Sequence, residues 1–128
     1  MENINTIGKI TLDYSKYPGE DFYCDGAIED EMLDIAMNYS KVEFNRIIEE
    51  RANWPIMYHF SKQRENIVDW LPMDKNMKVL EIGSGCGAIT GALSRKAGSV
   101  TCVELSKKRS LINATIHHNH KPQQRGRP

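Results

Sequence analysis

Apolar residues follow a helical spacing in the first half of the chain. Between residues 27 and 39 they recur three and four positions apart, which predicts an amphipathic helix. Acidic residues fill its first turn at 29–31, where the helix dipole favours negative charge, and Asp25 is placed to cap it. Upstream, Ile10 and Leu12 alternate with polar neighbours and predict a short strand.

Two further helices are predicted before the first glycine-rich segment. One starts at Ser40–Glu43, which has the spacing of a capping box, and its apolar face includes Val42. It ends at Trp54, which precedes a proline. The other runs from about residue 61 to 70 and turns Ile67 inward. The first half of the chain is therefore expected to be mainly helical.

The second half alternates between strands and helices. Apolar runs predict strands at Lys78–Ile82 and Ser99–Glu104, each followed by a helix, at Ala88–Lys96 and Ser106–Ile116. This order predicts an α/β fold with two parallel strands. Two parallel strands alone leave an open edge and wet apolar surface, so we expect an oligomer or a partner to cover the sheet edge.

Three alternating glycines, Gly83, Gly85 and Gly87, join the first of these strands to its helix. Glycine permits positive φ and lets backbone N–H groups approach a ligand, to which the helix N-terminus adds positive potential. The second strand ends in Glu104, roughly 20 residues further on, where a carboxylate can bind the hydroxyls of a ribose. The pattern predicts a nucleoside site.

Glu81 indicates which nucleoside cofactor is favoured. With Ala88, the glycines also fit the fingerprint of dinucleotide sites. A carboxylate two residues before Gly83 would repel a pyrophosphate, but it attracts the sulfonium and ammonium groups of S-adenosylmethionine. We therefore expect S-adenosylmethionine as the cofactor.

These motifs resemble those of the class I S-adenosylmethionine-dependent methyltransferases. Residues 79–87 are similar to their glycine motif, and residues 103–106 to the segment with their ribose-binding acid. Within the class, 81–90 together with 100–104 most resemble ribosomal RNA adenine dimethyltransferases. The resemblance covers about residues 58–116 and implies a partial Rossmann-like methyltransferase core, preceded by a helical N-terminal region.

The resemblance implies an S-adenosylmethionine-dependent methyltransferase and a set of cofactor-binding positions. These positions are Glu81, Gly83, Ser84, Gly85, Cys86, Gly87, Glu104, Leu105 and Ser106. The class has a seven-stranded sheet, so the chain is expected to be an N-terminal portion, inactive alone, whose catalytic residues are unknown. The acceptor stays open between RNA adenine, a small molecule and a sugar precursor. The alternative is a non-catalytic fragment that only binds cofactor or partner.

Composition and length refine the expected organisation. We expect an arm and helical lid region at 1–57, the truncated cofactor-binding core at 58–116 and a disordered tail at 117–128. The net charge is zero, so the charge of the chain as a whole does not favour binding to nucleic acid or to a membrane surface. The three cysteines are scattered, and neither a leader nor a long apolar run is present, which predicts a cytoplasmic protein without a membrane span.

Several side chains near the expected core allow two interpretations. Tyr58, Ser61 or Arg64 could close over the methionine end of the cofactor, with Arg64 meeting its carboxylate. The other interpretation makes Arg64 and Glu65 a solvated helix face. Trp54, like Trp70 and Tyr58, could stack on a base, although packing in the core or an interface is commoner.

The remaining candidates are the cysteines and the C-terminal segment. Cys86 is expected to fill space in the glycine turn, and Cys102 to be a core thiol in a buried strand. Residues 117–120 are rich in histidine and could ligate a metal, but we expect an incidental polar tail and no metal site. Residues 125–128 equal the core of an AT-hook, a match too short to favour DNA binding.

Overall fold

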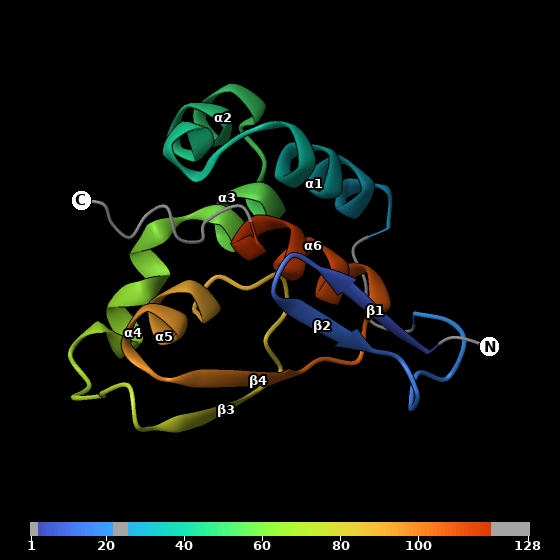
Figure 1. Cartoon of the computed structure of the whole chain (residues 1–128). Coiled ribbons are helices and arrows are strands. Elements are labelled where there is room, and N and C mark those ends of the chain that lie inside the picture. The colour runs from blue at the N-terminus through green and yellow to red at the C-terminus, as the bar shows by residue number, and fades with distance from the viewer. Residues whose placement is uncertain (1–2, 22–25, 119–128) are drawn as a thin grey trace.

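The computed structural model describes residues 3–21 and 26–118, which form a mixed α/β structure (Figure 1). In chain order its elements are β1 (Ile4–Ile7), β2 (Ile10–Asp13), α1 (Ala27–Asn38), η1 (Lys41–Glu43), α2 (Phe44–Arg51), α3 (Trp54–Phe60), η2 (Lys62–Glu65), α4 (Asn66–Asp69), β3 (Lys78–Ile82), α5 (Thr90–Lys96), β4 (Ser99–Val103) and α6 (Lys107–His118). In the view of Figure 1, α1 and α2 lie farthest from β3, with α3, α5 and α6 between them.

The chain begins with a β-hairpin that packs on α6. Strand β2 confirms the predicted strand, and β1 pairs with it antiparallel, with Ile4 opposite Asp13. The sequence prediction missed β1. The two strands are joined by a two-residue turn in which Gly8 has a φ of +59°, as tight hairpins require.

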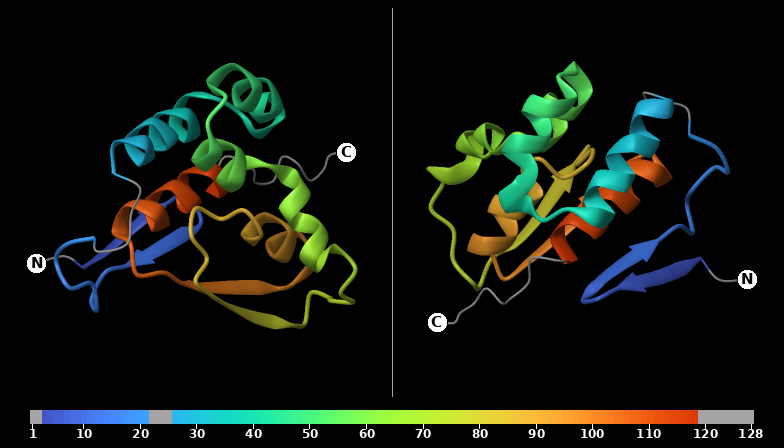
Figure 2. Two further views of the ribbon diagram at one scale, coloured as in Figure 1. Left: turned by 180° about the vertical axis from the view of Figure 1, so that it is seen from behind. Right: turned by 90° about the horizontal axis from the view of Figure 1, so that it is seen from above.

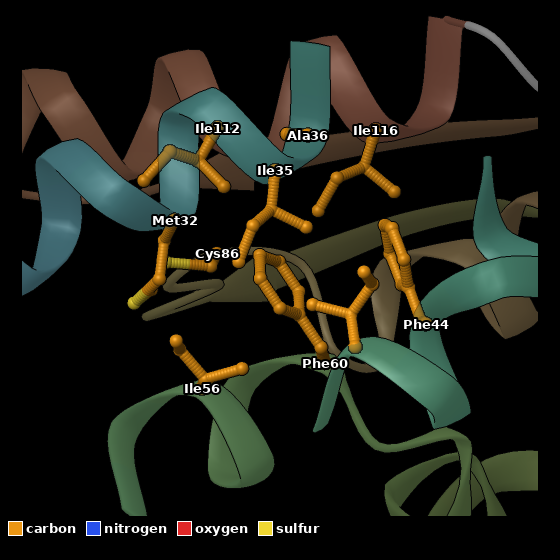
Figure 3. Close-up of a cluster of buried hydrophobic side chains, with 10 residues drawn as sticks. Met32, Ile35, Ala36, Phe44, Ile56, Phe60, Cys86, Ile112 and Ile116 are labelled. Carbon is orange, nitrogen blue, oxygen red and sulfur yellow. The ribbon is translucent and has the colours of Figure 1, made fainter. Parts of the chain in front are cut away.

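Helix α1 confirms the first predicted helix, although Asp25, its expected cap, lies outside the described residues. Its inward face is fully buried at Met32 and Ile35, which pack with Ile112 of α6 in one cluster (Figure 3). The cluster takes further side chains from α2, α3 and the glycine turn: Phe44, Ile47, Ile56, Phe60 and Cys86. The main core of the protein thus lies among helices.

The capping box at Ser40 is present, but it opens a 3-10 turn before α2. The Ser40 N–H donates to Glu43 Oε1 at 3.0 Å. Because the α-helix starts only at Phe44, that side chain and Ile47 are buried. The expectation that Val42 faces inward is wrong, since Val42 is 91% exposed.

Helix α3 is an element that the sequence prediction missed. Pro55 suggests a break, but the first helical turn tolerates proline because its N–H groups have no partner inside the helix. Asn53 caps this helix by accepting a hydrogen bond from the N–H of Ile56 at 3.0 Å. The helix predicted at 61–70 is instead a 3-10 turn followed by one α-turn, and Ile67 is exposed rather than inward.

Strands β3 and β4 confirm the predicted parallel pair, with Lys78 opposite Ser99 and Ile82 opposite Val103. Within the described residues, no other strand joins this sheet. Ile82 is 77% exposed, which agrees with the expected wet apolar surface. The expectation that Cys102 is a core thiol is wrong, because the residue is exposed although α5 packs on its strand.

The last element, α6, runs back along the molecule between the sheet and α1 (Figure 2). It extends through His118, two residues into the region expected to be disordered. Residues 119–128, including the AT-hook-like segment, lie outside the described residues. Among the residues described, no helix is long and apolar enough to cross a membrane.

Candidate nucleoside site

The glycine turn occupies residues 83–89, between the end of β3 and the start of α5. All three glycines have positive φ, at +75° for Gly83, +60° for Gly85 and +92° for Gly87. A Cβ built on Gly83 or Gly85 would meet nothing within 4 Å. The backbone at these two positions is therefore open to a ligand.

Gly87 has a different role from the other two glycines. A Cβ there would lie 2.1 Å from Asn113 Oδ1 and 2.9 Å from His117 Nε2, both on α6. The Gly87 carbonyl and His117 Nε2 are 3.0 Å apart and hydrogen-bonded. Gly87 thus lets α6 approach the turn, a packing requirement that no local sequence pattern reveals.

Glu104 follows β4 and links the glycine turn to the start of α6. Its Oε1 accepts a hydrogen bond from the Gly85 N–H at 2.8 Å, and its Oε2 accepts one from the Ser106 N–H at 2.9 Å. The Gly83 N–H donates to the Val103 carbonyl at 2.7 Å. The structure therefore brings together the two motifs that the sequence places about 20 residues apart.

Asp21 lies far from α6 in the sequence but binds its N-terminus, a role that the sequence does not predict. It accepts hydrogen bonds from the Ser106 hydroxyl at 3.0 Å and from the backbone N–H groups of Lys107 at 2.8 Å and Lys108 at 3.2 Å. Desolvation opposes ionisation, but these bonds outweigh it, so the pKa of Asp21 is lowered. A partner 85 positions away in the sequence leaves no local signal.

Glu81 lies inside a small polar network beneath the glycine turn. Its Oε1 accepts a hydrogen bond from the Thr90 hydroxyl at 2.5 Å and contacts the Cys102 thiol at 3.5 Å. Asn113 Nδ2 donates to the same Thr90 hydroxyl at 3.2 Å. Desolvation around the sulfur, followed by the charge of Glu81, raises the pKa of Cys102, which disfavours a reactive thiolate.

The other predicted site residues differ in accessibility. The Cys86 side chain is buried in the helical core, so only its backbone can face a ligand. The hydroxyl of Ser84 is buried and has no hydrogen-bond partner within the described residues. Leu105 is 66% exposed beside Glu104, whereas Ser106 is 1% exposed.

A small pocket lies between the helical region and the glycine turn. It has a volume of about 20 Å³, and its lining comprises Lys41, Phe44, His59, Phe60, Ser61, Lys62, Glu65, Gly87, Ala88, Ile116 and His117. Ser61 therefore lines the same pocket as Gly87 and Ala88 of the turn. Arg64 instead packs over the Tyr58 ring, with its guanidinium carbon 4.2 Å from the ring centroid.

The interpretation of Glu65 as part of a solvated face is wrong. Glu65 is 5% exposed and pairs with Arg95 of α5 at 2.8 Å. This ion pair ties the segment before β3 to the helix after it. Histidine residues 117 and 118 belong to α6, and no group of three or more potential metal ligands gathers within residues 3–21 and 26–118.

Comparison with known proteins identifies relatives over parts of the chain. Ribosomal RNA small subunit methyltransferase A of Treponema denticola is 41% identical over 46 residues, covering 36% of this chain and 16% of that protein. The protein of the same name from Borrelia garinii subsp. bavariensis is 31% identical over 88 residues, covering 63% of this chain and 31% of that protein. The chain thus spans less than a third of either relative. No solved structure matches it significantly.

A family comparison covers the glycine turn, both strands of the parallel sheet and α6. The sequence profile of the protein-L-isoaspartate(D-aspartate) O-methyltransferases (PCMT) matches residues 58–124, just over half of the chain. Its name and those of the relatives specify different acceptors, and transfer of a methyl group is what they share. The expected resemblance to methyltransferases is thereby confirmed, and the chain belongs to the PCMT family.

Proposed function

We propose that this chain forms the cofactor-binding part of an S-adenosylmethionine-dependent methyltransferase. The observation that carries the proposal is the contact between Gly85 and Glu104, which holds an open glycine turn against a carboxylate at the end of the neighbouring strand. In parallel α/β sheets, ligands bind at the carboxyl ends of the strands. The cofactor-binding positions expected from the sequence gather at this end of the sheet.

The hydrogen bonds of Glu104 leave room for a ribose. An ionised carboxylate offers about four acceptor positions. One on each oxygen is occupied, by the N–H groups of Gly85 and Ser106. The remaining acceptor on each oxygen suits one of two adjacent hydroxyls, so Glu104 can hold the ribose while it keeps the turn in place.

The charge of Glu81 favours a cationic ligand over a phosphate. Its carboxylate accepts hydrogen bonds from neutral groups only, and no described cation forms a salt bridge with it. A partly buried carboxylate without a cation attracts positive charge and repels a pyrophosphate. The ammonium and sulfonium groups of S-adenosylmethionine match this requirement.

The residues of this chain contribute binding and orientation. Gly83 and Gly85 leave open space beside the backbone, while their N–H groups hold the turn to Val103 and Glu104. The buried Ser84 hydroxyl next to them has no hydrogen-bond partner within the described residues. When bound, S-adenosylmethionine supplies a methyl group activated by its sulfonium. The turn, Glu81 and Glu104 would fix the direction of that methyl group, which is how positioning lowers a reaction barrier.

The acceptor is a separate part of the proposal. The relatives are named for ribosomal RNA and the family for isoaspartyl protein residues, so RNA adenine and a protein carboxyl group are both candidates. A small molecule or a sugar precursor as the acceptor is equally compatible with this cofactor site. We place the protein in the cytoplasm, where the thiols of Cys86 and Cys102 remain reduced.

The exposed sheet favours a second candidate, a module that binds cofactor or partner without catalysis. Leu80, Ile82 and Val103 are 60%, 77% and 49% exposed on the two-stranded sheet. A sheet of this size is marginal without further strands. A second copy or a partner protein that adds strands would bury these residues.

Calorimetry with S-adenosylmethionine tests the cofactor site in the full chain. Glu104→Ala is expected to weaken binding by about 1–3 kcal/mol, because it removes charge-assisted hydrogen bonds to the ribose. Glu49→Ala, an exposed acid on α2, is the matched control and should bind like the wild type. Thermal melts of each variant check that the fold persists. A cooperatively folded wild type that gives no heat with S-adenosylmethionine would falsify the proposal.

A further inference from the structure

We infer that Trp54, Tyr58 and Arg64 form a stacking platform for a base of single-stranded nucleic acid. The inference rests on the proposed function, because it names the class of acceptor whose methylation the site would serve. The three side chains come from α3 and η2, and residues 59–62 between them line a pocket together with Gly87 and Ala88 of the glycine turn. The sequence alone leaves base stacking by Trp54 and Tyr58 open and does not associate Arg64 with them.

The platform is built from contacts between exposed planar groups. The rings of Trp54 and Tyr58 are 5.4 Å apart between centroids, with 34° between their planes. The guanidinium of Arg64 lies over the Tyr58 ring at 4.2 Å. Trp54 is 63% exposed and Tyr58 41%, so planar surface remains available although the side chains order one another. Aromatic and guanidinium planes of this kind stack on nucleic-acid bases.

The charge of the segment suits a polyanion. Residues 54–64 contain Lys62 and Arg64 but no acidic residue, in a chain whose net charge is zero. Neither cation forms a salt bridge with a carboxylate of the described residues. Uncompensated cations beside exposed rings are the combination that holds phosphates and bases together in single-strand sites.

The position of the platform connects it with the cofactor site. Tyr58 makes an edge-to-face contact with His59, at 5.1 Å between centroids. His59 and Ser61 line the same small pocket as Gly87 and Ala88 of the glycine turn. A strand held on the platform would therefore run beside the turn that we propose binds the methyl donor. A peptide would also find aromatic anchors here, but it gains nothing specific from the excess of positive charge.

Binding of a fluorescein-labelled single-stranded RNA of roughly 12 nucleotides tests the platform by anisotropy in the full chain. Trp54→Ala and Tyr58→Ala should each weaken binding by roughly 5- to 100-fold, the range expected for a lost stack. Trp54→Phe should restore most of the affinity. Trp70→Ala is the matched control, because Trp70 is 73% exposed and its indole N–H donates to the Ile67 carbonyl in α4.

Three further measurements decide between base stacking and other causes. An abasic oligonucleotide of equal length should bind no better to the wild type than to Trp54→Ala. In a Trp70→Phe background, RNA should quench the fluorescence of Trp54. Calorimetry with S-adenosylmethionine should give the same affinity for Trp54→Ala as for the wild type, which separates failure here from failure of the cofactor site.

The inference is overturned if the folded wild type binds no RNA, or if Trp54→Ala binds it as tightly as the wild type does. It is also overturned if labelled unstructured peptides of matched length, but not RNA, lose affinity with Trp54→Ala. That outcome would assign the surface to a protein partner. Equal loss for the abasic oligonucleotide would also overturn the inference, because the lost affinity would then not come from stacking on a base.

Discussion

Helices α1, α2, α3 and α6 and the parallel strands β3 and β4 differ in how much apolar surface they bury. Met32, Ile35 and Ile112 of the helices are fully buried, whereas Leu80 and Ile82 of β3 are mostly exposed. The glycine turn lies at the boundary and is anchored in the helical core through Cys86 (Figure 3). The proposed ligand site is thus supported chiefly by the helices, although its sequence motif begins in a strand.

The largest effect is expected from breaking the ion pair between Arg109 of α6 and Glu29 of α1. Arg109 Nε lies 2.7 Å from Glu29 Oε2, and the Glu29 side chain is fully buried. Arg109→Ala should lower the free energy of unfolding by about 3–5 kcal/mol, because it removes a cation that pairs with a buried carboxylate. Urea denaturation measures the change.

The exposed pair Arg46–Glu50 on α2 is the control for this prediction. Both of its side chains are 53% exposed, so Arg46→Ala should cost less than about 1 kcal/mol. Replacing Arg109 and Glu29 together by leucine should recover much of the loss. Equal costs for Arg109→Ala and Arg46→Ala would show that the contact between α1 and α6 is not the main support of the fold.

The next largest effect is expected when one isoleucine from each region is replaced by alanine. Ile112→Ala removes a fully buried side chain from the helical core and should cost about 2–5 kcal/mol. Ile82→Ala, on the exposed strand, should change stability by less than about 0.5 kcal/mol. If Ile112→Ala unfolds the protein, Ile112→Val gives a smaller, measurable loss. A large cost at Ile82 would mean that the sheet is covered in solution, by a second copy or by another part of the protein.

The smallest effect concerns Lys41, which lines the pocket at the boundary between the two regions. Desolvation, helped by the charges of Arg95 and Lys62 and opposed by Glu65, lowers its pKa to about 8. Since the unfolded value is 10.5, burial of the charged amine destabilises the fold below pH 8, and the cost is relieved as the pH rises from about 8 to 10.5.

Lys41→Met should therefore be more stable than the wild type at pH 7, by about 1–3 kcal/mol. The advantage should shrink as the pH rises through that window. Urea denaturation at pH 7, 9 and about 10.5 measures it, with Lys78→Met on the exposed strand β3 as the control. An advantage that does not change with pH would show that the amine is not desolvated in the fold.

The predictable parts of this fold are those specified by neighbouring residues. The helix at 27–38 follows from its apolar spacing, and strands β3 and β4 from apolar runs bounded by glycine or polar residues. The spacing of about 20 residues after Gly83 predicts Glu104 as a ribose-binding acid at the end of the second strand. The hydrogen bond from Gly85 to Glu104 agrees with that placement, although the ligand remains a proposal.

The parts that could not be predicted depend on long-range contacts. The burial of Glu65 depends on Arg95, 30 positions away, and the start of α6 on Asp21. The exposure of Cys102 depends on how much of its strand the rest of the fold covers, which the strand itself does not encode. Asn53 offered a local signal that was overlooked, since a capping residue before Trp54-Pro55 favours a helix start over a break.

The close approach of Gly87 and Asn113 restricts how this turn can evolve. A side chain at position 87 would have to overcome both a φ of +92° and the amide of Asn113. That amide is itself engaged with Thr90, whose hydroxyl binds Glu81. The four positions are thus coupled: among related sequences, loss of the glycine should coincide with a smaller residue on α6 and a changed partner for the acid. Such covariation would reveal the network without any structure.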